Sequence, residues 1–192
     1  MTRVLIVQGH PDGEEQHLCH AIAEAYRSAA EDAGHRVTVI NIAVGDIPCL
    51  RSKAEWEGSD LPQVAVTGQK AVQDAEHIVL IYPLWMGDVP AMLKAWLEQV
   101  LRKGFAFEMS GRTWRPALAG RSARVIVTMG MPGAAYRWFY MAHSLRSLDR
   151  NILRFCGFRP VRRSIFGNAE DPSGKAQAKM LKTAARLGAR AQ

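Results

Sequence analysis

The first residues able to do chemistry lie just after the opening apolar segment, in the stretch GHPDGEEQHLCH. Two glycines and a proline make Gly9–Gly13 a loop. A helical pattern of apolar residues begins near Gln16 and ends at Gly34. The free N–H groups and the macrodipole at a helix N-terminus favour a phosphate. The segment therefore predicts an anion-binding loop at the start of a helix.

The second group follows a short apolar run and reads Pro83, Leu84, Trp85, Met86, Gly87, Asp88. Bulky apolar side chains beside a glycine are unusual in a turn that faces only solvent. This composition predicts a surface on which a planar ring lies. The alternative is that Trp85 simply packs against the protein.

The third group follows another apolar run and contains Thr128, the loop Met129–Gly133 and Tyr136. It offers backbone N–H groups and a phenol. A phosphate end, an apolar slot and a polar edge together describe a flavin nucleotide site. For Tyr136 the alternative is an aromatic ring that caps the core at the start of a helix.

These loops need a scaffold that brings them together, and the apolar pattern supplies one. Helical patterns alternate with five apolar runs that predict buried strands, at Arg3–Gln8, Val37–Ile42, Ile78–Tyr82, Ser122–Thr128 and Pro160–Ile165. This alternation predicts an α/β fold: one domain over residues 1–192 with a doubly wound, flavodoxin-like sheet of five parallel strands. In such a sheet the loops at the carboxyl ends of the strands line one crevice.

The connecting segments carry weaker signals. The main helices are expected at about 16–34, 90–101, 135–156 and 173–189, from apolar residues at three- and four-residue spacing. Residues 43–70 predict a long irregular connection with a short helix near Ser52–Glu57, followed by a helix at Gln69–Ala75. The loop Glu108–Gly120 predicts a small hairpin.

Composition bounds the class of protein. Apolar residues make up 48% of the 192 residues and charged residues 22%, which is ordinary for a globular protein. No apolar stretch approaches the roughly 18 residues of a membrane span, and the chain begins directly with a strand, so we expect a cytoplasmic protein. Three separated cysteines without a CxxC motif predict neither a disulfide framework nor a zinc site.

The net charge of +7 is concentrated in the last third of the chain. Residues 137–192 hold twelve Lys or Arg against three Asp or Glu. Their helical spacing is typical of solvated helix faces. A surface for an anionic cofactor, a membrane or a partner is the alternative. No nucleic-acid motif accompanies the charge, so we expect no nucleic-acid partner.

The stretch YPLWMGDVPAMLKAWLEQVLRKGFAF resembles the signature of the NAD(P)H quinone reductase family with the flavodoxin-like fold, which includes cytoplasmic ancillary subunits of bacterial potassium-efflux systems. The resemblance extends to GHPDGEEQHLCHAIAEA, TMGMPGAAYRW and NILRFCGF, and covers residues 4 to about 167. It implies that the protein binds FAD or FMN, with FAD slightly favoured, takes hydride from NADPH or NADH as co-substrate, and reduces a quinone or similar acceptor, usually as a dimer.

The resemblance also implies roles for individual residues. The segment that holds the flavin phosphates corresponds to His10, Gln16, His17, Leu18 and Cys19. The residues along the isoalloxazine correspond to Pro83, Leu84, Trp85 and Met86. The loop on its pyrimidine side corresponds to Thr128, Met129, Gly130 and Met131.

Three further positions follow from the same resemblance. Tyr136 matches the family's active-site tyrosine, and His143 resembles the histidine that follows it, one residue further along than in well-known members. For His143 the alternative is an ordinary helix histidine. Phe107 matches an aromatic position that reaches into the partner subunit's site. Independently, the helix at 90–101 is apolar around much of its circumference, which predicts a homodimer.

One departure concerns the first loop, where family members commonly carry Ser or Thr. This chain has Glu14, Glu15, Gln16 and His17 there, and two carboxylates near a phosphate repel it unless they point to solvent. His17 and His20 have the spacing of a metal pair, but no third ligand is near in sequence, so we expect no metal.

Two other functions remain open from the sequence. One is a one-electron carrier like flavodoxin, although such carriers are typically acidic. The other is a nucleotide-sensing ancillary subunit that docks on a membrane potassium-efflux transporter through its basic face.

Overall fold

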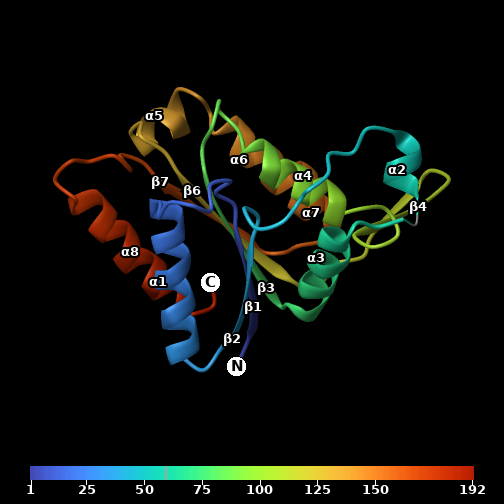
Figure 1. Cartoon of the computed structure of the whole chain (residues 1–192), viewed down its shortest axis with the longest axis horizontal. Helices are drawn as coiled ribbons and strands as arrows, with labels where there is room; N and C mark the ends of the chain where they lie inside the picture. The colour runs from blue at the N-terminus through green and yellow to red at the C-terminus, as the bar shows by residue number, and fades with distance from the viewer. Residues whose placement is uncertain (59) are drawn as a thin grey trace.

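The fold is a parallel sheet of five strands, described by a computed structural model for residues 1–58 and 60–192. The strands are β1 (Arg3–Gln8), β2 (Arg36–Asn41), β3 (His77–Pro83), β6 (Ser122–Thr128) and β7 (Val161–Phe166). Their order is β2-β1-β3-β6-β7, all parallel (Figure 1). This confirms the predicted doubly wound topology, with each predicted strand end within one residue of the observed end.

Helices cover both faces of the sheet, which explains why the central strands are apolar without alternation. On one face, Ile6 and Ile81 pack with α1 (Leu18–Asp32) and α8 (Lys175–Gly188). On the other, Leu5 and Leu80 lie in a second core with α4 (Ala91–Val100), which packs beside α3 (Gln63–Asp74). The two layers are visible on either side of the sheet in Figure 1.

The helix after β1 begins at Leu18 rather than near Gln16. His17 has an extended backbone and acts as its N-cap, in a capping box with His20. The helix ends at Asp32, and Gly34 follows with a φ of 82°, which suits a residue without a Cβ. The start of α1 therefore lies directly beside the loop after β1.

Helix α4 starts after Pro90, as predicted, but its apolar circumference has a different explanation from the one that the sequence suggested. Leu93, Trp96, Leu97 and Val100 are all buried within the chain itself. Contacts from α3 and from the segments around Phe107 and Cys156 cover the surface that the sequence assigned to a second copy. The apolar pattern of α4 is thus not evidence for a dimer.

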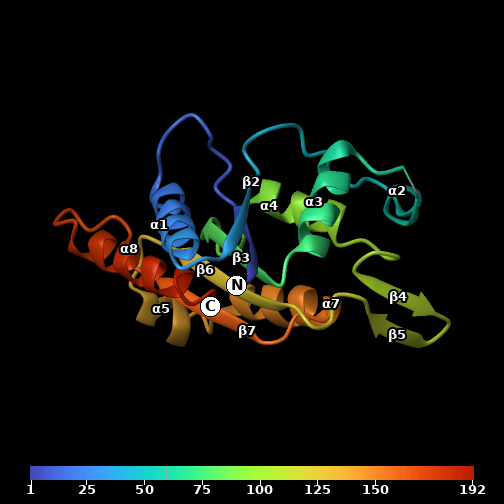
Figure 2. The same ribbon diagram turned by 90° about the horizontal axis from the view of Figure 1, so that it is seen from below.

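The segment between β2 and β3 is more regular than expected. The short helix is present as α2 (Lys53–Glu57), capped by the Ser52 side chain. The next helix, α3, begins at Gln63, directly after Pro62, so the prediction of irregular chain to residue 70 and of a helix only from Gln69 is wrong. The predicted hairpin is present as β4 (Phe107–Ser110) and β5 (Thr113–Pro116), and it projects from one end of the molecule (Figure 2).

The single long helix predicted for residues 135–156 is wrong. The chain forms α5 (Gly133–Trp138), α6 (His143–Ser147), a π-helix (η1, Leu148–Leu153) and α7 (Arg154–Cys156). Met141 and Ala142 separate α5 from α6 with left-handed φ values of 54° and 47°. Neither residue is a glycine or a proline, so the sequence carries no helix-breaking signal here. Within the described residues, no helix is long and apolar enough to cross a membrane.

Candidate functional site

The loops after β1, β3 and β6 meet around a cavity of about 270 Å³. We call it the strand-end cavity. It brings together most of the residues predicted to bind a cofactor, namely His10, His17, Leu18, Cys19, Pro83, Leu84, Trp85, Thr128, Met129 and Gly130. The predicted convergence of three loops is confirmed.

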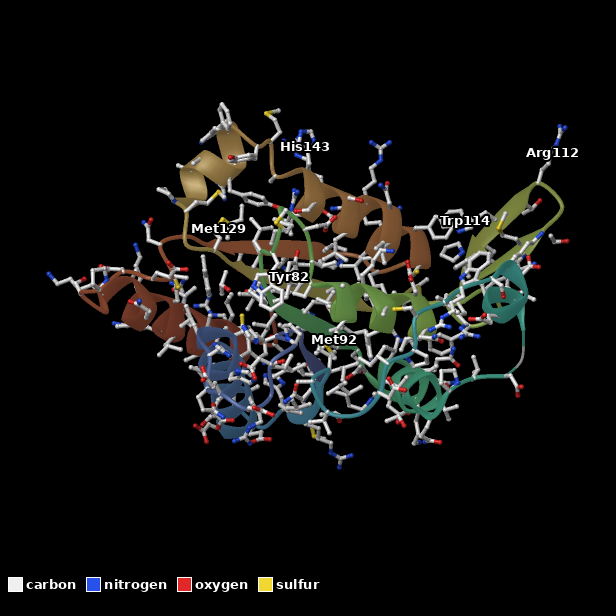
Figure 3. All side chains as sticks on the ribbon, turned by 45° about the horizontal axis from the view of Figure 1, so that its top comes forward. Tyr82, Met92, Arg112, Trp114, Met129 and His143 are labelled. Atoms are coloured by element: carbon white, nitrogen blue, oxygen red, sulfur yellow. The ribbon has the colours of Figure 1, made fainter. Side chains whose placement is uncertain are left out.

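Other predicted site residues do not line this cavity, namely Gln16, Met86, Met131, Tyr136 and His143. Gln16 is exposed, and the Met86 side chain projects fully into solvent from a backbone with a φ of 46°. His143 is exposed at the start of α6, away from the centre of the molecule (Figure 3). A functional role for these residues stays a prediction.

A cluster of aromatic side chains forms the end of the cavity near α1. The rings of His10 and His17 are stacked with their centroids 3.9 Å apart. Trp85 meets His10 edge-on with the ring centroids 5.6 Å apart, and the His20 ring lies at the same centroid distance from His10. The β1 loop and the β3 loop are therefore in direct contact through His10 and Trp85.

The hydrogen bonds of this cluster fix its proton positions. The Asp12 N–H donates to His10 Nδ1 at 3.2 Å, and the His17 N–H donates to His20 Nδ1 at 3.1 Å. Each neutral ring therefore carries its proton on Nε2. Burial, and then the neighbouring His17, lower the pKa of both His10 and His20. Near pH 7 the two rings are neutral Nε2–H donors beside a helix N-terminus.

The carboxylates of the first loop do not crowd this donor set. Asp12 Oδ2 accepts a hydrogen bond from His17 Nε2 at 2.7 Å, and Asp12 Oδ1 accepts from the Glu14 N–H. These contacts, led by that from His17, lower the pKa of Asp12 to about 2. Glu14 and Glu15 are exposed, so the repulsion that the sequence suggested is relieved by their orientation to solvent.

A possible cation site lies at the same loop. Asp12, Glu15 and His17 each place one ligand atom within 4.8 Å of the others. His17 Nε2 already bonds to Asp12, and Glu15 is exposed, so this grouping alone gives no reason to assign a metal.

The apolar wall of the cavity is held by a tight turn. Trp85 and Asp88 exchange two backbone hydrogen bonds of 3.0 and 2.9 Å, with Met86 and Gly87 in left-handed conformations between them. The Leu84 N–H donates to Thr128 O at 2.8 Å, which ties this turn to the end of β6. The turn presents Trp85 with 48% of its surface exposed. A half-exposed indole on a fixed turn is suited to contact a flat ligand.

The cavity floor contains a buried thiol. Cys19 Sγ lies 3.3 Å from Thr128 Oγ1, which links the first turn of α1 to the end of β6. Burial raises the pKa of Cys19 to about 11, so the thiol is protonated at neutral pH. It therefore acts as a small apolar group with a weak donor.

The sequence missed a fourth wall, formed by Ala169 and Glu170 in the loop after β7. The Ala169 N–H donates to Met129 O at 2.9 Å, which fixes this loop against the β6 loop. The Glu170 carboxylate lies against Gly130, 3.1 Å from where a Cβ would stand. Only the rule that all carboxyl strand ends meet at one edge would have pointed there.

The Tyr136 hydroxyl is engaged inside the protein rather than in the cavity. The side chain is 2% exposed, its hydroxyl lies 2.7 Å from Ser144 Oγ, and it accepts a hydrogen bond from the Leu145 N–H at 3.2 Å. Leu145 lies in the first turn of α6, whose N–H groups have no acceptor within the helix. Tyr136 thus caps α6 from the preceding helix.

This geometry predicts that Tyr136→Phe lowers stability. The change leaves the Leu145 N–H and the Ser144 hydroxyl without their partner in a buried position, which costs about 2 kcal/mol. We expect Tm to fall by about 4–8 °C in differential scanning calorimetry. Tyr140→Phe, at a side chain that is 51% exposed, is the matched control and should leave Tm unchanged. An unchanged Tm with slowed flavin reduction would instead support the catalytic role that the family resemblance implies.

Phe107, expected near a partner's site, is buried in its own chain. It is 5% exposed, and its ring meets Phe155 edge-on at 4.9 Å and Trp56 at 6.2 Å. Trp114 of the hairpin also packs against Phe155, with the ring centroids 5.0 Å apart, near α7 (Figure 3). A reach of Phe107 into another subunit would require this ring to leave its cluster.

Comparison with known proteins gives consistent matches over the whole chain. A family model described as the flavodoxin-like fold matches residues 2–190. The NAD(P)H:quinone oxidoreductase from Methanothermobacter marburgensis has a TM-score of 0.85 at 24% identity, covering 100% of this chain and 99% of that one. An FMN-dependent NADH-azoreductase from Bacillus anthracis str. Ames Ancestor, solved in complex with FMN, has a TM-score of 0.75 at 17% identity over 98% of this chain and 100% of its own.

A shorter match is closer in sequence. The glutathione-regulated potassium-efflux system ancillary protein KefG of Serratia proteamaculans (strain 568) is 49% identical over 47 residues, or 24% of each chain. This match spans only about a quarter of that curated relative. The family model covers nearly the entire chain, and the strand order and the converging loops agree with it. The chain therefore belongs to the family of proteins with the flavodoxin-like fold.

Proposed function

We propose that this protein is a flavin-dependent NAD(P)H oxidoreductase that passes two electrons to a quinone or an azo compound. One observation carries the proposal: a single cavity joins hydrogen-bond donors at a helix N-terminus to an indole wall and to a strand-end loop. Solved structures with the same fold include an NAD(P)H:quinone oxidoreductase and an FMN-dependent azoreductase. These likenesses support the choice of reaction class.

The residues of the strand-end cavity fit a flavin nucleotide. The Nε2–H group of His10, which lines the cavity, and the N–H groups of the first turn of α1 suit phosphate oxygens. The His20 ring lies beside His10, with the ring centroids 5.6 Å apart. Trp85 and Leu84 would hold the ring, and the loop from Thr128 to Gly130 would hold its polar edge. A cavity of about 270 Å³ is close to the lower bound of roughly 300 Å³ for ligand pockets, so it suits FMN at least as well as FAD.

A bound flavin would supply hydride acceptance and two-electron transfer, and the chain would supply position and electrostatics. Backbone N–H groups aimed at a polar edge stabilise negative charge that develops there. Trp85, half exposed, would leave one side of the ring slot open to solvent for a nicotinamide and then an acceptor. Glu170, at the rim, offers a carboxylate acceptor to a ligand N–H.

The test is a titration of the purified, flavin-stripped protein with FMN, FAD and riboflavin, followed by NADPH or NADH oxidation with a quinone and with an azo dye. We expect flavin binding and two-electron turnover with at least one acceptor. Protein that binds no flavin would refute the proposal. Flavin binding without turnover, with stable one-electron reduction, would indicate a carrier of the flavodoxin type.

The histidine cluster predicts that FAD binds more tightly as the pH falls from 8 to 5. The pKa values of His10 and His20 are lowered in the free protein, and a bound pyrophosphate would raise them. The complex then holds more protons than its separate parts, so lower pH favours it. Protonation of His10 Nδ1 breaks the hydrogen bond that it accepts from the Asp12 N–H, which offsets part of the benefit. We therefore expect the affinity for FAD to rise about tenfold, which corresponds to one unit of pKa.

FAD is the right ligand for this measurement because a phosphate monoester such as FMN itself titrates near pH 6. Riboflavin has no phosphate and is the matched control, with an affinity expected to stay constant. A His10→Gln variant should flatten the FAD profile. Equal pH profiles for FAD and riboflavin would place the effect outside the histidine cluster.

A second candidate function is supported by the partial match to the KefG ancillary protein. In this case the chain docks on a membrane transporter and signals the state of its bound nucleotide. Affinity purification from a host membrane fraction, with detection of a co-purifying transporter, distinguishes it from a free-standing enzyme.

A further inference from the structure

A second cavity, unrelated to the strand-end cavity, lies along the outer edge of the sheet. It has a volume of about 720 Å³ and shares no lining residue with the strand-end cavity. Five arginines line it, namely Arg124, Arg137, Arg146, Arg162 and Arg163. We call it the arginine cavity. Its walls come from β6, β7, α5 and α6.

The sheet edge explains how arginines from distant parts of the sequence gather here. β7 is the last strand of the sheet, so its outer side has no neighbouring strand. Successive side chains of a strand point to opposite faces. Arg162 and Arg163 therefore approach the cavity from the two faces of β7, while α5 and α6 contribute Arg137 and Arg146.

Most of this charge has no counter-ion. Among the described residues, the one ion pair that involves a lining arginine joins Arg163 Nε to Asp149 Oδ2 at 3.5 Å, and Asp149 is shared with Arg154 at 2.6 Å. No carboxylate lines the cavity. Four of the five lining arginines thus have no acidic partner within the described part of the chain.

Arg124 is the lining arginine whose surroundings most favour a bound anion. It is 6% exposed, it lines the cavity, and its Nε has no hydrogen-bond partner among the described residues, whereas one Nη donates to Ser164 Oγ at 2.7 Å. It stands directly opposite Arg162 in the β6–β7 register. Like charges side by side on neighbouring strands repel each other, and a buried cation without a counter-ion is costly. A bound anion would relieve both effects.

We propose that the arginine cavity binds a small molecule that carries two or more phosphate groups. Arginine is the preferred side chain for phosphate because its planar fork makes paired hydrogen bonds. The volume lies within the range of roughly 300–1,000 Å³ for ligand pockets. Trp138, which is 75% exposed, and Met141 add an apolar wall that suits a flat ring, so a nucleoside diphosphate matches both parts.

The experiment measures binding of ADP and of inorganic pyrophosphate by isothermal titration calorimetry, at fixed ionic strength and on FMN-saturated protein so that the strand-end cavity is filled. We expect Arg162→Gln to raise the dissociation constant about tenfold or more. The matched control is Arg112→Gln, at the tip of the β4–β5 hairpin far from α5 and α6 (Figure 3). This control variant should change the dissociation constant less than twofold.

A second variant addresses the buried residue. Arg124→Met removes the unpaired charge and keeps the volume, so ligand-free protein should melt at an equal or higher temperature while ADP no longer raises Tm. A fall in Tm with an unchanged response to ADP would make Arg124 a structural residue and overturn its role in binding.

Vesicles identify the source of the phosphate. One outcome would support the same site with a lipid headgroup as its ligand. In this outcome the protein binds phosphatidylcholine vesicles that contain phosphorylated inositol lipids, Arg162→Gln abolishes this binding, and ADP itself does not bind. Equal weakening by Arg162→Gln and Arg112→Gln would show only general attraction to a basic protein and overturn the proposal. Failure to bind ADP, pyrophosphate and these vesicles, each supplied at a millimolar concentration of phosphate groups, would overturn the proposal as well.

Discussion

Replacing Gly167 with alanine is expected to lower the free energy of unfolding by about 3 kcal/mol and Tm by about 6–12 °C. The reason is the contact between the β7 and β6 loops. A Cβ on Gly167 would overlap the Gly133 backbone nitrogen and would lie 2.7 Å from Met131 O. Both neighbours are backbone atoms, so the two loops must separate. Because the Asn168 N–H donates to Met131 O and the Ala169 N–H to Met129 O, this separation also opens the strand-end cavity.

Chemical denaturation of the flavin-free protein measures this effect. Gly130→Ala is the matched control, because the added methyl meets only the end of the flexible Glu170 side chain, at 3.1 Å. We expect this variant to stay within about 0.5 kcal/mol of the parent. Equal stability of Gly167→Ala and the parent would mean that the two loops are not in contact in solution.

Replacing Trp85 with alanine is expected to weaken FMN binding by about tenfold to a hundredfold. An aromatic side chain that stacks on a nucleotide ring contributes about 1–3 kcal/mol. Trp85 is the large flat side chain of the strand-end cavity, and its turn is held by its own two backbone hydrogen bonds. Because the indole is half exposed, the loss should appear in ligand affinity rather than in stability.

Fluorescence titration with FMN and riboflavin checks this result. Trp85→Phe keeps a flat ring and should recover most of the affinity. Both ligands should lose affinity equally in Trp85→Ala, because the indole contacts the ring and not the phosphate. If Trp85→Ala binds FMN as tightly as the parent, the indole only packs against His10.

The sheet could be predicted from sequence because its signal is local. Runs such as Arg3–Gln8 and Ser122–Thr128 are apolar over the length of a strand and are bounded by loop residues. The order of the strands follows from the handedness of the crossovers, and the position of the cavity follows from the order. The sequence therefore predicts that His10, Trp85 and Met129 lie close together.

The break after α5 could not be predicted because it is stabilised by side-chain contacts that the apolar pattern does not show. Tyr136 caps α6 through Ser144 and the Leu145 N–H, eight and nine residues later. A helical pattern of apolar residues runs through this region without a glycine or a proline. The same limit applies to α4, whose apolar surface is covered by elements that sequence alone does not place beside it.

The arginine cavity was only partly visible in the sequence. The sequence shows that the last third of the chain is basic, but the helical spacing of these charges favours solvated helix faces. Arg124 comes from outside that third, on a strand that the sequence predicts to be buried. Its position opposite Arg162 depends on the β6–β7 register, which no pattern within either strand defines.

The burial of Cys19 and Cys156 affects whether these thiols can be oxidised. Only a thiolate exchanges with a disulfide or is readily oxidised. Burial raises the pKa of Cys19 to about 11 and that of Cys156 to about 12, and Cys19 stands in the floor of the strand-end cavity. The thiol nearest to the proposed redox centre is thus held in its inert form. We therefore expect Cys19 to stay reduced while the reaction proposed for this cavity turns over.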